Sequence, residues 1–114
     1  MKLDRNINAD GLGKYAILNL RRLGSFIDTA DPFADVAEPI ATALKTLEKA
    51  GILDWGRQGS ESEFFLIKLK DKYAQAGLAA YAREAVVDDP EYGGEIWEMA
   101  RRAGPASPFC KKPD

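Results

Sequence analysis

The stretch that most constrains the fold lies between residues 39 and 70, where one helical pattern is followed by two apolar runs. Gly51 follows the helical pattern and ends it, because glycine readily adopts the left-handed conformation found after a last helical turn. Before it, apolar residues recur at spacings of three, four and seven, which is typical of one helix face: Ile40, Ala43, Leu44 and Leu47. The pattern predicts a helix over about residues 39–50.

The two apolar runs that follow, residues 52–55 and 64–69, are separated by a polar connector that contains glycine. Bulky residues with high strand propensity fill the second run. This arrangement predicts a β-hairpin over residues 52–70. Residues 14–20 repeat the order of residue types seen in the second run, so we expect a further strand there, although their spacing also fits a helix.

Two more helices are predicted after the hairpin. The first, over about residues 72–87, is alanine-rich, which implies close approach to its neighbour, and Asp71 is its expected N-cap. The second, over about residues 90–103, begins with Asp89 as N-cap and Pro90 in the first turn, and ends before Gly104. Its two adjacent glycines disfavour a helix unless another backbone or a partner crosses closely there.

These elements indicate an α+β fold, with an antiparallel sheet packed by three helices. At 114 residues the chain has the length of one small domain, which we place at residues 1–104. Residues 105–114 contain three prolines and are predicted to form an extended tail, with Phe109 docked on the core.

Composition excludes several classes of function. The chain has no histidine, which removes the commonest acid-base group near neutral pH. No run of eighteen apolar residues is present, so we expect no membrane span, and a single cysteine favours a cytoplasmic location. The net charge of −2 does not favour nucleic acid as the partner, although dispersed lysines still allow it.

Few residues suggest catalytic chemistry. Cys110 lies beside two lysines, but without a histidine base an incidental tail thiol explains it better. The one carboxylate cluster lacks the spacing of a calcium loop and is explained by helix capping: Asp88, Asp89, Glu91 and Glu95. We therefore expect no cofactor or metal, and a small metal-dependent enzyme ranks third among the candidate functions.

Aromatic residues are the candidate contacts of a protein partner. The candidate interface residues are Phe26 and Phe33 in the loop before the first helix, and Tyr92 and Trp97 in the last helix. For Phe26 and Phe33, the first expectation is that they anchor this loop to the core. Trp55 and Trp97 are also candidates for stacking on a ring, although such residues more often lie at the edge of a core.

Residues 43–53, followed by the predicted hairpin ending in FFLIKLK, resemble the recognition helix and wing of winged helix-turn-helix regulators. The resemblance implies that the helix enters the major groove of DNA and that the wing touches the backbone. The residues that would face DNA in this alternative are Thr42, Lys45, Thr46 and Lys49.

The whole chain loosely resembles small uncharacterised proteins of tailed phages and prophages, through GKYAILNLRRL near the start, ESEFFLIKLKDKYA in the middle and SPFCKKPD at the end. The resemblance implies a compact accessory protein that binds and modulates a host factor. Our leading hypothesis is therefore a non-enzymatic protein-interaction module, and the alternative is a winged-helix DNA-binding regulator.

Overall fold

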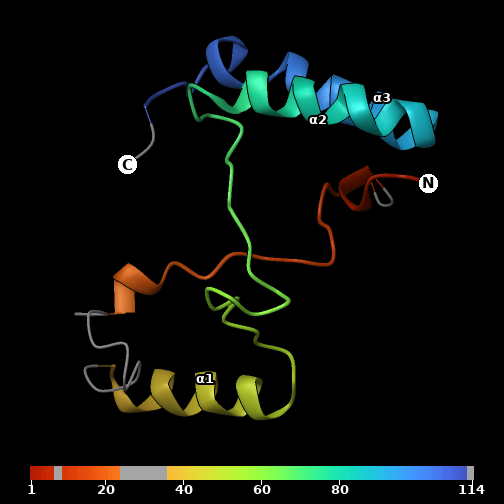
Figure 1. Cartoon of the computed structure of the whole chain (residues 1–114). Coiled ribbons are helices and arrows are strands. Elements are labelled where there is room, and N and C mark those ends of the chain that lie inside the picture. Colours follow the sequence, from red (N-terminus) through yellow and green to blue (C-terminus); the bar gives the residue numbers. More distant parts are fainter. Residues whose placement is uncertain (7–8, 24–35, 113–114) are drawn as a thin grey trace. The chain divides into compact units, whose positions relative to one another are not determined.

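The computed structural model describes residues 1–6, 9–23 and 36–112 (Figure 1). These residues contain three α-helices, α1 (Glu38–Lys49), α2 (Ala74–Asp88) and α3 (Pro90–Arg101). They also contain three short 3₁₀ turns, Asp4–Asn6, Leu20–Leu23 and Gly104–Ala106. The chain divides into two compact units: unit 1 comprises Met1–Ala16 with Phe65–Asp114, and unit 2 comprises Ile17–Phe64.

The predicted sheet is wrong. Among the described residues, strand pairing is limited to one isolated parallel bridge between Asp71 and Lys111. The expected hairpin over residues 52–70 consists of turns and irregular backbone, and the expected strand over residues 14–20 is irregular up to residue 19, with Leu20 beginning a 3₁₀ turn. The described chain is thus mainly helical rather than α+β, and the wing that a winged-helix fold requires is absent from it.

Local hydrogen bonds explain why the hairpin does not form in unit 2. The carboxylate of Asp54 accepts the backbone N–H of Gly56 (2.9 Å), and that of Glu63 accepts the backbone N–H of Gly59 (2.8 Å). The hydroxyl of Ser60 donates to the backbone oxygen three residues before it (2.6 Å). These bonds hold the connector in a series of tight turns, because short polar side chains compete with strand pairing for backbone groups.

Helix α1 lies where the sequence predicts it, but its inward face differs from the expected one. Ala41 and Leu44 are buried, whereas Ile40 is 44% exposed. Gly51 follows the helix with a φ of +77°, which confirms its role as the terminating residue. Within unit 2, the backbone N–H groups of Ile52 and Leu53 both donate to Leu47, and the chain turns back on the end of the helix.

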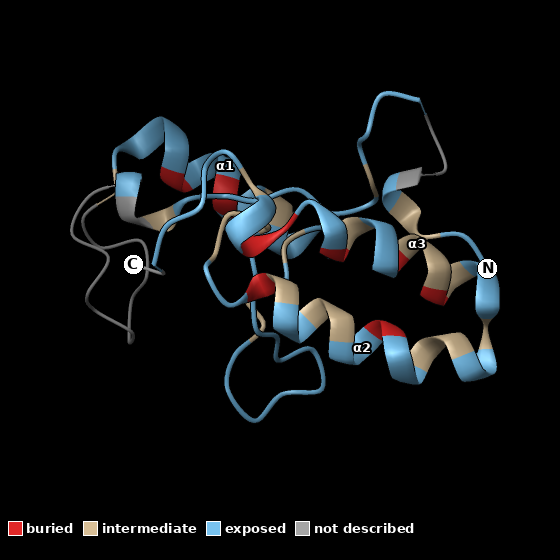
Figure 2. Cartoon of the chain, turned by 90° about the horizontal axis from the view of Figure 1, so that it is seen from above, coloured by how far each residue is buried: buried red, intermediate tan, exposed pale blue. Residues whose placement is uncertain are grey.

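The core of unit 1 lies between α2 and α3, which are joined by the single residue Asp89 and lie side by side as a helix hairpin (Figures 1 and 2). Small side chains fill most of this core: Ala74, Ala82, Ile96, Ala100 and Ala103 are buried. Gly93 marks the closest approach, since a Cβ atom added there would lie 2.5 Å from the Cα atom of Val86. Another backbone therefore crosses at Gly93, which was one of the two expectations for this glycine.

The two predicted N-caps have different outcomes. Asp89 caps α3, because its carboxylate accepts the backbone N–H of Tyr92 (3.1 Å), and Pro90 occupies the first turn as predicted. The prediction for Asp71 is wrong, since α2 begins at Ala74. The carboxylate of Asp71 instead accepts the N–H of Tyr73 (2.8 Å) in a local turn.

Backbone hydrogen bonds attach the C-terminal segment to the residues before α2. The N–H of Gly104 donates to Leu69 (2.7 Å) and that of Lys111 to Lys70 (3.0 Å), while Lys111 accepts from Lys72 (2.9 Å). The expected docking of Phe109 is wrong, since its side chain is 74% exposed. The segment is held by its main chain rather than by an aromatic anchor.

We predict that the adjacent glycines of α3 respond in opposite directions to alanine. Gly93→Ala forces a methyl group against the Val86 backbone and should destabilise the fold by about 1–3 kcal/mol. Gly94→Ala meets no atom within 4 Å and should stabilise the helix by about 0.5–1 kcal/mol. Urea unfolding followed by circular dichroism measures both, and equal effects at the two positions would contradict the close crossing.

We also predict that Asp89→Ala lowers the melting temperature, whereas Asp88→Ala, at the end of α2, leaves it nearly unchanged. The N–H of Tyr92 lowers the pKa of Asp89, so its contribution is present above the ordinary aspartate range and is lost as pH falls through the lowered pKa. The melting temperatures of Asp89→Ala and wild type should therefore converge in acid. A difference that persists in acid would assign the effect to something other than the ionised cap.

Candidate functional site

The predicted interface residues have different surroundings. Phe26 and Phe33 lie outside the described residues. Trp97 lies on α3 and is 37% exposed, so part of the residue is accessible to a partner. Tyr92 is half-buried, and its hydroxyl lies 3.1 Å from that of Tyr81. This contact joins α2 to α3, so Tyr92 contributes to the packing of the helix hairpin as well as to the surface.

The residues proposed to contact DNA share the outer face of α1, where all four are exposed: Thr42, Lys45, Thr46 and Lys49. Two of them make local hydrogen bonds. The hydroxyl of Thr42 bonds to Glu38 (2.8 Å), and the hydroxyl of Thr46 donates to the backbone oxygen of Thr42 (2.9 Å).

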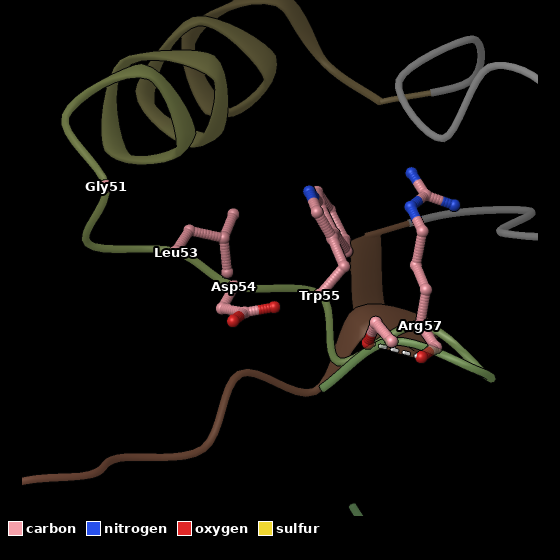
Figure 3. Close-up of a pocket in the computed structure, with 6 residues that line it drawn as sticks. Gly51, Leu53, Asp54, Trp55 and Arg57 are labelled. Atoms are coloured by element: carbon pink, nitrogen blue, oxygen red, sulfur yellow. Dashed lines mark hydrogen bonds between the residues drawn. The ribbon is translucent and has the colours of Figure 1, made fainter. Parts of the chain in front are cut away.

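A shallow cavity of about 300 Å³ lies in unit 2, in the turns that follow α1 (Figure 3). Its charged groups do not converge, since Asp54 projects away from the side of the loop on which Trp55 and Arg57 lie (Figure 3). The backbone N–H of Gly56, and then the Ser62 hydroxyl, lower the pKa of Asp54, so this carboxylate is a poor proton donor. The indole N–H of Trp55 donates to Glu48. The cavity is thus built from turn-forming groups and lacks a paired acid and base.

A second cavity, of about 340 Å³, lies at the turn of the helix hairpin. Tyr81 and Tyr92 line it, and their rings meet edge to face with centroids 6.3 Å apart. The hydrogen bond with the Tyr81 hydroxyl, and then burial, raise the pKa of Tyr92 to about 12. The Tyr92 hydroxyl therefore does not ionise near neutral pH to act as a base.

The carboxylates near this cavity are engaged by the N-terminal segment. The amino group of Met1 pairs with Asp89 (3.0 Å) and Glu91 (3.2 Å), and the Glu95 carboxylate accepts the N–H of Leu3. No group of three metal-binding side chains occurs within the described ranges. In the structure these carboxylates serve the cap of α3 and hold the N-terminal segment.

Residues 65–67 form an exposed apolar segment that was not expected, because the sequence pattern predicts a strand there. Phe65 is 86% exposed, Leu66 50% and Ile67 37%. In the described part of the chain, none of their backbone groups forms a hydrogen bond with another backbone group. One signal was available: two adjacent phenylalanines cannot both face one core from a strand, since successive side chains point to opposite sides.

Comparison of the chain with protein-family models, curated proteins and solved structures finds no match. None of the helices in the described residues is both long and apolar enough to cross a membrane. The resemblances noted in the sequence therefore remain predictions.

We predict that Tyr81→Phe lowers the pKa of Tyr92 from about 12 toward its ordinary value of 10.0, because the substitution removes the hydrogen bond that raises it. Tyr73→Phe, which removes a hydroxyl elsewhere, should leave the Tyr92 titration unchanged. Spectrophotometric titration of tyrosinate measures both. Because the pKa is raised in the folded state, the stability that the pair contributes is present below pH 10 and is lost as pH rises through about 12.

Proposed function

We propose that this chain is a non-enzymatic protein-interaction module and that its partner covers the apolar segment, residues 65–67. The observation that carries the proposal is the contrast between core and surface. Unit 1 buries mainly alanine and leaves Phe65 86% exposed. Contiguous large apolar side chains on a surface mark sites of association more often than single ones do.

The energy available at the apolar segment is sufficient for an anchor. Fully burying one large apolar side chain is worth about 1.5–3 kcal/mol, and Phe65 and Leu66 are adjacent. Ile67 lies over α2, where its Cδ1 atom is 3.8 Å from a Cβ atom built at Gly77. That contact attaches one end of the segment to a helix and presents its neighbours outward.

The groups near the segment favour recognition over catalysis. The chain has no histidine, the tyrosine with a shifted pKa remains neutral, and the lowered pKa of Asp54 suits a turn rather than proton transfer. The likeness to phage and prophage proteins makes a host protein the partner in this proposal. A cytoplasmic location accords with the single cysteine.

We predict that Phe65→Ser/Leu66→Ser weakens partner binding by at least tenfold, because two central anchors are removed. The matched control is Ile52→Ser/Val87→Ser, which alters residues that are 74% and 80% exposed and lie outside the segment. Affinity purification with mass spectrometry identifies the partner, and titration with the purified partner gives the dissociation constants.

Circular dichroism of both double variants first establishes that they fold. Loss of binding in the segment variant alone supports the proposal. Equal binding by wild type and both variants would assign the interaction to another surface, and absence of any stoichiometric partner would remove the interaction module itself.

A further inference from the structure

The charges of unit 1 are segregated along its sequence. Residues 68–72 and 101–112 together hold seven basic residues and one acidic residue, whereas residues 84–98 hold six acidic residues and no basic ones. The overall charge of −2 is therefore a sum of opposite local charges, and it says little about what either region attracts.

The backbone brings the two basic segments together. Lys111 accepts from the N–H of Lys72 and donates to Lys70, and the parallel bridge between Asp71 and Lys111 lies at this contact. The start of α2 lies beside the end of α3, since the side-chain amide of Gln75 donates to the backbone oxygen of Ala100 (3.2 Å). Two lysine-bearing segments that are distant in sequence thus lie side by side.

Two exposed aromatic side chains lie beside these lysines. Tyr73 is 60% exposed and Phe109 is 74% exposed, and each is two residues from a position of the bridge. The Nζ atom of Lys72 lies 5.9 Å from the centre of the Tyr73 ring. The one acidic residue, Asp71, has its carboxylate engaged by a backbone N–H.

We propose that this basic surface binds single-stranded nucleic acid; it comprises Lys70, Lys72, Tyr73, Phe109, Lys111 and Lys112. Lysines neutralise phosphates, and flat rings stack on unpaired bases, which is the combination that single-strand binding uses. A duplex keeps its bases stacked inside and leaves Tyr73 and Phe109 without a role. An acidic polypeptide would use the lysines alone.

The test is fluorescence anisotropy of the purified full chain with labelled oligo-dT and oligo-U over a series of salt concentrations. Engagement of four phosphates predicts a slope of log affinity against log salt of roughly −3, from about −0.7 per phosphate. Lys70→Glu/Lys72→Glu should weaken binding more than tenfold and reduce the magnitude of the slope. The matched control, Lys45→Glu/Lys49→Glu on α1, should bind like wild type.

Tyr73→Ala/Phe109→Ala should weaken binding by about tenfold with the salt slope unchanged, because stacking releases no counterions. Equal effects of the two charge reversals, or equal affinity for duplex DNA, would overturn the proposal. So would affinity for polyglutamate equal to that for oligo-dT. None of these variants alters the apolar segment, and no protein partner is present, so this inference and the proposed function can fail separately.

Discussion

The structure of unit 1 depends on the close packing of α2 against α3 at Gly93. A glycine there lets the Val86 backbone approach to a distance that no side chain would allow, and alanines continue the same contact along both helices. Because these side chains are small, the stability of the hairpin comes from short interhelical distance rather than from a large apolar core. Several large apolar residues, Phe65 among them, are consequently exposed instead of packing in this core.

The helices were predictable because their signals are local. Asp89 followed by Pro90 starts α3, and the glycine after α1 has the expected positive φ. The strands were not predictable in this way, since strand pairing depends on which segments, distant in sequence, come together in space. The apolar run from residue 64 has high strand propensity, but Asp54 and Glu63 use backbone groups of the intervening turns.

The candidate surfaces show a similar division. Periodicity indicates which residues share a face, but it does not reveal whether anything covers that face, so the exposure of Phe65 followed only from the structure. Composition is limited in a similar way, because it gives the sum of the charges but not their positions. The net value argued against a polyanion, whereas the backbone hydrogen bonds of Lys111 bring two lysine-bearing segments together.

The attachment of the C-terminal segment through main-chain atoms has a consequence for engineering. Since the bonds of Gly104 and Lys111 use only N–H and C=O groups, the path of this segment does not depend on most of its side chains. Side chains at residues 105–112 can therefore be replaced without disturbing the fold. The exception is proline at a residue whose backbone N–H donates a hydrogen bond. Affinity labels or altered ligand preferences could therefore be installed there one position at a time.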